Sequence, residues 1–238
     1  MTKRPQESPY DAIAHLYDAW SASVTEDVGF YLAEARRSGG PVVELGVGTG
    51  RIAIPLAADG IRVIGVDTSR RMLDVCARRA ALAGVDLDLR VGDLTSPPVS
   101  ERVPLVICPF RSYLHLHTEE ERRRALAAAR DLLLDGGRIV FDVFAPAADD
   151  IDSTHDRWLQ REPGIWERAV WDARAKTLTL TVRGEAAEAT MALAWIEPNE
   201  WRTLLADAGF EVEDCFGWFD RSPYRGGEDA IWVARRSS

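Results

Sequence analysis

The stretch VVELGVGTGR, residues 42–51, decides the fold of this chain. A short run of β-branched and apolar residues leads directly into the glycine-rich turn GVGTG (46–50), and a helical pattern follows at once. Glycines at such a turn permit unusual backbone angles and let the backbone approach a ligand closely. The stretch therefore predicts a strand, a ligand-binding turn and a helix at the start of an α/β sheet.

An acidic residue, Asp67, ends the next predicted strand, IRVIGVD (61–67), about 20 residues after the turn. A carboxylate at this place accepts hydrogen bonds from the hydroxyls of an adenosyl ribose. NAD and S-adenosylmethionine (SAM) both carry that ribose. Asp67 therefore indicates an adenosyl cofactor without separating the two.

Two residues beside the turn favour SAM. The dinucleotide pattern G-x-G-x-x-G needs glycine at position 51, where this chain has Arg51. Glu44 precedes the turn, where its charge would repel a pyrophosphate but attract the ammonium and sulfonium of SAM. The alternative is a glycine-rich turn with Glu44 paired to an internal arginine, and it leaves Asp67 unexplained.

Strand-like and helical segments alternate up to residue 145. Ser69 is placed to cap one helix, and Thr118 with Glu121 forms a capping box for another that we expect to end at 135–137. Such alternation predicts a parallel sheet covered on both faces. The predicted strands are 41–46, 61–67, 85–93, 103–110 and 138–144.

Residues 145–196 break this rhythm. APAADD (145–150) indicates a linker, and the three β-rich segments that follow lack helices between them, which predicts a small antiparallel insertion. A helix opening at Pro198 and a terminal hairpin complete the core. Before the first strand, Tyr10–Trp20 and Asp27–Arg36 have helical patterns. We divide the chain into an N-terminal helical cap (1–40), a core (41–145), the β insertion (146–196) and the C-terminal part of the core (197–238).

Composition excludes several classes of function. The chain has 29 Lys and Arg against 38 Asp and Glu, a net charge of −9, which disfavours nucleic acid as a partner. Its three cysteines lie far apart, and no cluster has metal-ligand spacing, so we expect no disulfide framework and no metal. Without a signal-peptide pattern or an apolar run near ~20 residues, we expect a cytoplasmic protein with no membrane contact, either a monomer or a homodimer.

Several segments together resemble the successive motifs of class I SAM-dependent methyltransferases. They are VVELGVGTGRIAIPLA, VIGVDTSRRML, VGDL and LLLDGGRIVFDVF, and the match is strong over roughly residues 40–145. The C-terminal tail is similar to that of the small-molecule branch, the methyltransferase-domain 11/25-like families. The resemblance implies a Rossmann-like seven-stranded doubly wound sheet with an antiparallel last strand, to which we add the helical lid and the β insertion.

The resemblance also places the cofactor. Glu44, Gly46, Gly48 and Gly50 would line the methionine part of SAM, and Asp67 would hold the ribose. Met72 would pack on the adenine or belong to the helix core, and Asp93 would face the adenine amino group or merely form a turn. The set implied for the cofactor is completed by Thr68, Leu94 and Pro109.

The acceptor is expected beyond the end of the fourth strand, where residues 109–117 read PFRSYLHLH. This resembles the F-x-S-x-x-H-L stretch of small-molecule members, and no N-P-P-Y or D-P-P-Y motif for nucleic-acid bases or protein amides is present. His115 is the candidate base or acceptor-orienting group, or a packing residue. His117 is expected at the surface. Arg111 and Tyr113 are weaker candidates for contact with the acceptor or the SAM carboxylate.

Aromatic residues outside the core suggest further walls of the site. The early segment YDAIAHLYDAW resembles a lid that folds over SAM, with Tyr17 near the sulfonium; packing on the core is the alternative. Trp158, Trp166, Trp171 and Trp195 would wall an acceptor pocket, form the insertion's own core or pair subunits. In the run GWFDRSPY (217–224), Asp220 or Tyr224 would touch the acceptor, or Asp220 and Pro223 would hold a turn.

The sequence predicts SAM-dependent methyl transfer to nitrogen or oxygen of a small metabolite, such as one of secondary metabolism, with S-adenosylhomocysteine as product. A nicotinamide-dependent oxidoreductase and a non-catalytic SAM-binding protein are the alternatives. Methylation of nucleic acid or protein is disfavoured by the net charge and by residues 109–117.

Overall fold

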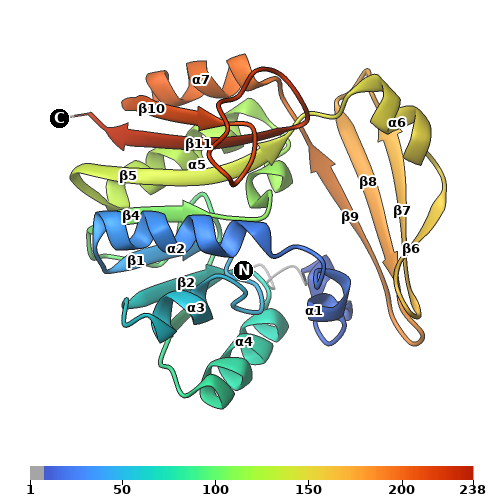
Figure 1. The fold of residues 1–238 in the computed structure, drawn as a ribbon, viewed down its shortest axis with the longest axis horizontal. Coiled ribbons are helices and arrows are strands. Elements are labelled where there is room, and N and C mark those ends of the chain that lie inside the picture. Colours follow the sequence, from blue (N-terminus) through green and yellow to red (C-terminus); the bar gives the residue numbers. More distant parts are fainter. Residues whose placement is uncertain (1–7, 238) are drawn as a thin grey trace, which may run out of the picture.

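A seven-stranded sheet forms the centre of the molecule in the computed structural model, which describes residues 8–237 (Figure 1). Its strand order is β10-β11-β5-β4-β1-β2-β3, and β11 is antiparallel to both of its neighbours. The fold class predicted from the sequence is therefore confirmed. The strands are β1 Val42–Leu45, β2 Val63–Asp67, β3 Asp88–Val91, β4 Val103–Cys108, β5 Leu133–Phe144, β10 Phe210–Phe216 and β11 Asp229–Arg236.

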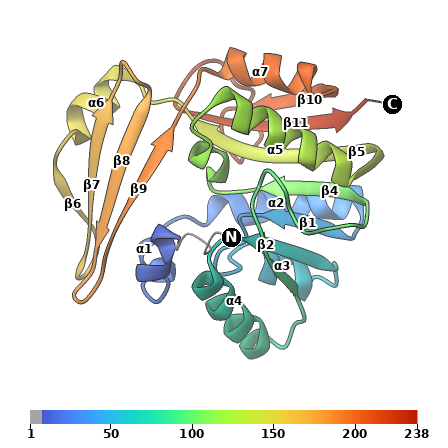
Figure 2. The same ribbon diagram turned by 180° about the vertical axis from the view of Figure 1, so that it is seen from behind.

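Helices cover both faces of this sheet. On one face lie α2 (Glu26–Ser38), α3 (Ala53–Ala58) and α4 (Arg70–Ala83); on the other lie α5 (Glu119–Leu132) and α7 (Pro198–Asp207) (Figures 1 and 2). The capping residues act as predicted, because the Ser69 hydroxyl accepts from the Met72 N–H and Thr118 forms its capping box. The expected end of α5 at 135–137 is wrong, since β5 already begins at Leu133.

Side chains of β1 alternate between the two faces. Val43 and Leu45 pack in the core beneath α5 and α7, whereas Val42 packs in the core beneath α2 and α3. Glu44 therefore shares a face with Val42, because neighbouring residues of a strand point in opposite directions. A carboxylate thus enters the buried layer under α2.

The insertion is a four-stranded antiparallel sheet preceded by a short helix. Its elements are α6 (Ala148–Thr154), β6 (Trp158–Glu162), β7 (Ile165–Asp172), β8 (Thr177–Arg183) and β9 (Glu188–Ala194). The linker predicted at 145–150 is wrong from Ala148 onward, because Asp150 caps the helix by accepting from the Ala147 N–H. Strand β6 escaped prediction because it is an edge strand whose mostly exposed side chains lack an apolar alternation.

The N-terminal segment is not the continuous helix expected over Tyr10–Trp20. It forms a 3-10 turn, η1 (Pro9–Ala12), and the single turn α1 (Tyr17–Trp20), wedged between the sheet and the insertion (Figure 2). Ile13, Leu16 and Trp20 pack against the inner face of the insertion. This packing orients Tyr10 and Tyr17 toward the core. Within residues 8–237, the helices are all too short or too polar to cross a membrane.

Candidate active site

The glycine turn after β1 is packed too tightly for side chains. Gly46, Gly48 and Gly50 have φ angles of 76°, 55° and 84°, in the left-handed region that favours glycine. A Cβ on Gly46 would lie 2.5 Å from the Ser112 Oγ, and one on Gly50 would lie 2.6 Å from the Cys76 Sγ. Both neighbours belong to other elements, so the turn is fixed against η2 (Ser112–His115) and α4. Its backbone is thereby presented to a ligand.

Glu44 is a buried carboxylate whose charge is only partly offset, by the nearby Arg51. Its side chain is 2% exposed, and its Oε2 has no hydrogen-bond partner within residues 8–237. Arg51 instead bonds Asp27 through both terminal nitrogens, at 2.6 Å each, so the pairing of Glu44 with this arginine is not found. Burial raises the pKa of Glu44 well above its usual range. A carboxylate in this state fits a positively charged ligand in the adjacent turn.

The Glu44→Gln variant tests this fit. We expect the ligand-free protein to become more stable, because the variant has no charge to bury. A buried polar group without a hydrogen-bond partner costs about 1–3 kcal/mol, and a charged one costs more. SAM should bind about 10- to 100-fold more weakly, since a hydrogen bond to a charged group contributes about 1.5–3 kcal/mol. Thermal unfolding and titration calorimetry measure the two effects. Equal loss of stability and affinity would show that Glu44 is only structural.

Because the pKa of Glu44 is raised, its ionisation also sets a pH dependence. The folded protein holds this proton to higher pH than the unfolded chain, so ligand-free stability declines as pH rises from the unfolded value toward the folded one. Over the same pH range SAM affinity should increase as pH rises, because only the ionised carboxylate attracts a cation. The Gln variant should lack both trends.

Asp67 joins the glycine turn to the next helix. Its carboxylate accepts the Gly48 N–H at 2.9 Å and the Ser69 N–H at 2.8 Å. Burial raises its pKa, while these backbone bonds lower it and offset part of the effect. An ionised carboxylate has about four acceptor positions, so two backbone bonds leave capacity for ribose hydroxyls.

The remaining residues proposed for the cofactor lie around the same turn. The Met72 Cε would be 3.4 Å from a Cβ on Gly48, so Met72 both contacts the turn and belongs to the buried face of α4. Asp93 is exposed and accepts the Thr95 N–H, which is a turn-forming contact. Leu94 is half-buried against the core, Thr68 is exposed, and the Pro109 carbonyl accepts from the Ser112 hydroxyl. Their roles toward the cofactor stay predictions.

A cavity of about 420 Å³ lies between the sheet, the N-terminal segment and the insertion; the turn after β4 lines it, whereas the glycine turn does not. Such a volume suits a small organic molecule. One part of the wall is aromatic: Tyr10, Trp20, Phe110, Phe144, Trp171, Trp218 and Phe219. The charged part is mostly acidic: Glu26, Asp27, Asp142, Glu167, Glu228 and Asp229, with Arg111 and Arg161.

His115 lines the cavity and contacts the N-terminal segment. Its Nε2 lies 2.9 Å from the Tyr10 hydroxyl, and the two rings meet edge to face. Burial, with a smaller contribution from His117, lowers the pKa of His115 to about 4, so its imidazole is neutral near pH 7. His117 is exposed, with its Nε2 3.0 Å from the Ala192 carbonyl oxygen.

The turn after β4 is strained and held by a buried acid. Phe110 and Arg111 have φ angles of 55° and 63°, which non-glycine residues rarely adopt. Asp142 accepts both of their N–H groups, at 2.9 and 3.0 Å, and also the Tyr31 hydroxyl at 2.6 Å. Burial raises the pKa of Asp142 to about 6. Arg111 is thereby directed along the cavity wall, where it pairs with Asp229 at 2.8 Å.

The N-terminal segment is tied to the glycine turn and to α4 with its cap by two aspartates. Asp18 accepts from the Thr49 hydroxyl at 2.6 Å and from Arg79 at 2.7 Å. Asp11 accepts from the Ser69 hydroxyl at 2.5 Å. These acids were not identified from the sequence, although they lie in the YDAIAHLYDAW segment that indicated a lid. The half-buried Tyr17 meets Phe110 edge to face, with ring centroids 6.5 Å apart.

Several weaker candidates lie elsewhere. Tyr113 is fully buried and stacks on Trp201 beneath α7, so it does not line the cavity. Asp220 accepts the Ser222 N–H, as the turn interpretation predicts, and the Tyr224 hydroxyl bonds Gly227. Trp218 and Phe219, which the sequence did not single out, line the cavity instead.

Of the four tryptophans in the insertion, some line the cavity and others do not. Trp171 lines the cavity, and Trp195 packs against it with ring centroids 5.6 Å apart. Trp166 is 40% exposed, and Trp158 lies under the Arg183 guanidinium, away from the cavity lining. One face of the insertion therefore walls the cavity.

Comparison with known proteins agrees with this geometry. A family model described as a methyltransferase domain matches residues 42–137, from β1 into β5. A protein of Geobacillus sp. (strain WCH70) named as a methyltransferase is 25% identical over 232 residues, which span 92% of this chain and 93% of the relative. The matched segment of the family model contains the glycine turn, Asp67 and His115.

Solved structures extend the likeness to the whole chain. The CcbJ methyltransferase from Streptomyces caelestis matches with a TM-score of 0.84 and 26% identity, covering 99% of this chain and 100% of its own. SAM-bound CalS10, an amino pentose methyltransferase from Micromonospora echinaspora, matches with a TM-score of 0.65 and 18% identity over 100% of both chains. The insertion and the N-terminal segment are thus part of a shared architecture.

Proposed function

Because this chain belongs to the class I SAM-dependent methyltransferases, we propose that it transfers a methyl group to the nitrogen of a small-molecule amine. The observation that carries the proposal is the cavity at the turn after β4, with its aromatic walls and its excess of carboxylates. Aromatic rings and carboxylates both attract organic cations. An amine of modest size meets both properties of the wall.

The cofactor is assigned to the glycine turn and the acids around it. Glu44 lies in the buried layer under α2, just before the glycine turn, and would balance the positive charge on the methionine part of SAM. Asp67 would accept hydrogen bonds from the ribose hydroxyls. When bound there, SAM supplies an electrophilic methyl group on a sulfonium. The protein's part is to bind, to orient the acceptor in line with that methyl group, and to exclude water, and positioning of this kind can supply effective molarities of ~10⁵ M or more.

The charged lining favours nitrogen over oxygen as the acceptor atom. Three of its acids pair with arginines within the protein: Asp229 with Arg111, Asp27 with Arg51, and Glu167 with Arg161 at 3.9 Å. Glu228 is half-buried on the same wall, and burial raises its pKa. An ammonium group entering the cavity would compensate such a carboxylate and, by giving its proton to it, would become the neutral amine that can attack; an alcohol would do neither. CalS10, which shares the architecture, is an amino pentose methyltransferase.

His115 is proposed to orient the amine by accepting a hydrogen bond from its N–H, so that the nitrogen lone pair points toward the methyl group. A pKa of about 4 makes its imidazole a weak base, unsuited to deprotonating an alcohol. A neutral amine needs no such help, because its lone pair forms the new N–C bond as the C–S bond breaks, which gives S-adenosylhomocysteine and a methylated ammonium that loses its proton to solvent after release. The hydrogen bond to Tyr10 fixes the ring, and the edge-to-face rings of Tyr17 and Phe110 help to close the cavity to water.

Transfer of radiolabelled methyl from SAM to matched pairs of acceptors tests the proposal. Phenethylamine and glucosamine are compared with 2-phenylethanol and glucose, which replace the amine with a hydroxyl. We expect turnover of at least one amine and none of its alcohol. Methylation of the alcohols in preference to the amines would contradict the nitrogen assignment, and binding of NAD(H) without SAM would contradict the cofactor.

His115→Ala is expected to lower kcat for the amine substrate about 10- to 100-fold. This is at or below the low end of the rate enhancement that general acid–base groups typically contribute. The Kd for SAM should stay within about twofold. Tyr10→Phe removes only the partner hydroxyl and should have a smaller effect in the same direction. An unchanged kcat in His115→Ala would remove His115 from the mechanism. Since its pKa is about 4, protonation of His115 should reduce kcat only as pH falls toward that value.

A further inference from the structure

We propose that Arg221 is a positioning residue that sets acceptor affinity, because its ion pair with the buried Glu34 holds Trp218 and Phe219 against the acceptor cavity. The proposal rests on the function proposed above for that cavity. It concerns the loop between β10 and β11, which is remote in sequence from the glycine turn. Neither Glu34 nor Arg221 lines the cavity.

Helix α2 carries a buried polar stripe that reaches three parts of the site. Asp27, Tyr31 and Glu34 are 1%, 0% and 0% exposed, and their spacing places them on one face of the helix. Asp27 bonds Arg51, and Tyr31 bonds the acid that holds the turn after β4. Glu34 is the third member of the stripe. Each member thus fixes a different segment around the cofactor turn and the cavity.

Glu34 binds the β10–β11 loop through one strong contact. Its Oε1 accepts from the Arg221 guanidinium at 2.5 Å, while its Oε2 has no hydrogen-bond partner within residues 8–237. Arg37 lies farther away, at 3.9 Å. Because a buried carboxylate is costly without its partner, the folded protein strongly favours the conformation in which the Arg221 guanidinium lies beside Glu34. Its backbone adopts a φ of 69° to reach it.

The guanidinium also packs in an aromatic cluster. It lies over the rings of Phe30 and Phe216, at 4.8 and 5.6 Å from their centroids. Phe219 packs on Phe30 as well, with centroids 5.8 Å apart. Trp218 accompanies Phe219 because the loop is internally bonded: the Trp218 carbonyl accepts the Arg221 N–H at 3.1 Å. Fixing Arg221 therefore fixes both aromatic residues of the cavity wall.

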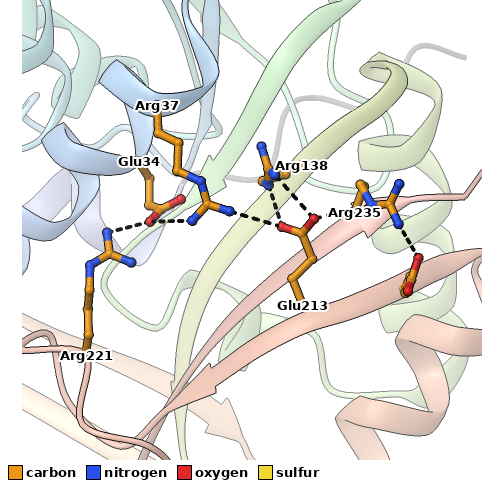
Figure 3. A network of polar contacts seen from close by, with 7 residues as sticks. Glu34, Arg37, Arg138, Glu213, Arg221 and Arg235 are labelled. Atoms are coloured by element: carbon orange, nitrogen blue, oxygen red, sulfur yellow. Dashed lines mark hydrogen bonds and ion pairs between the residues drawn. The ribbon is translucent and has the colours of Figure 1, made fainter.

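Figure 3 shows how this contact differs from the rest of its network. Arg37 bridges Glu34 to Glu213, which also pairs with Arg138 and Arg235. Those pairs join α2 to the strands of the sheet. Arg221 alone among the labelled residues comes from the loop that bears Trp218 and Phe219. Arg37, at 44% side-chain exposure, thus provides a matched control from the same network.

The test compares Arg221→Met, Arg37→Met and the double variant Glu34→Gln with Arg221→Met. The double variant removes the uncompensated buried charge, so it restores stability without restoring the tether. Deuterium uptake is measured by mass spectrometry in protein saturated with S-adenosylhomocysteine. We expect faster uptake over 217–225 in both Arg221 variants, unchanged uptake over the glycine turn, and no change in Arg37→Met.

Steady-state kinetics with phenethylamine then measure the effect on the acceptor. In both Arg221 variants we expect KM for the amine to rise about 10-fold, the loss in affinity expected when one favourable contact is removed. The kcat and the Kd for S-adenosylhomocysteine should stay within about twofold. Arg221→Lys should recover part of the affinity. A double variant with normal KM and normal uptake, or an equal change in Arg37→Met, would overturn the proposal. Faster uptake without methylation of any amine would instead contradict the proposed function and leave the tether supported.

Discussion

Asp142→Ala is expected to destabilise the protein by about 3–5 kcal/mol, a large share of the roughly 5–15 kcal/mol available to a folded domain. The carboxylate accepts from the Tyr31 hydroxyl and from the N–H groups of Phe110 and Arg111. Removing it leaves three buried or half-buried donors without an acceptor and releases a turn held at positive φ. Urea unfolding followed by circular dichroism measures the loss.

Two variants separate the contributions. Tyr31→Phe removes one donor and should cost about 1 kcal/mol, the usual net value of one hydrogen bond. Asp142→Asn keeps an acceptor for Tyr31 and Phe110 but places an amide donor opposite the Arg111 N–H, so an intermediate loss is expected. If Asp142→Ala cost no more than Tyr31→Phe, the acid would not be what holds the turn.

The pH dependence of stability provides a further check. The pKa of Asp142 is about 6 in the folded protein, above its usual value of 3.8, so the folded state binds this proton more tightly than the unfolded chain does. Its contribution to stability is therefore largest below pH 4 and declines as pH rises to about 6. Asp142→Asn should lack that decline.

Asp67→Ala should weaken SAM binding by about 2–4 kcal/mol, or roughly 30- to 700-fold. The variant removes the proposed acceptor of the ribose hydroxyls and also the acceptor of the Gly48 and Ser69 N–H groups. Titration calorimetry measures the affinity. Asp67→Asn, which keeps one acceptor oxygen, should lose less. Unchanged affinity in the alanine variant would contradict the placement of the ribose.

The sheet and the glycine turn are predictable because local rules determine them. A β-branched run before glycines at positive φ, an acid ending the next strand and capping residues at helix starts all act within a few residues. The segment from β1 into β5 is therefore visible in the sequence, and the family comparison agrees. Helix α6 and strand β6 escaped because their exposed side chains show no apolar period.

The acceptor half depends on contacts between distant residues. Asp142 holds a turn more than 30 positions earlier in the chain, and Glu34 meets Arg221 at a separation of 187 residues. The sequence does not distinguish a buried acidic residue of α2 from an exposed one, because acidic residues are common on helix surfaces. Trp218 and Phe219 likewise gain their place in the cavity wall only through tertiary packing.

The insertion's separate sheet has a consequence for how this enzyme type diversifies. Its four strands pair only with one another in the described chain, yet their inner side chains, such as Leu159, Leu178 and Leu193, line the cavity. Leu178 and Leu193 belong to the same buried cluster as Val43 and Leu45 of β1, whereas Leu159 is 38% exposed, so we expect substitutions at Leu159 to reshape the cavity with the smaller effect on the central sheet. Evolution can thus exchange one acceptor for another on this scaffold while the methyl-donor half is inherited intact.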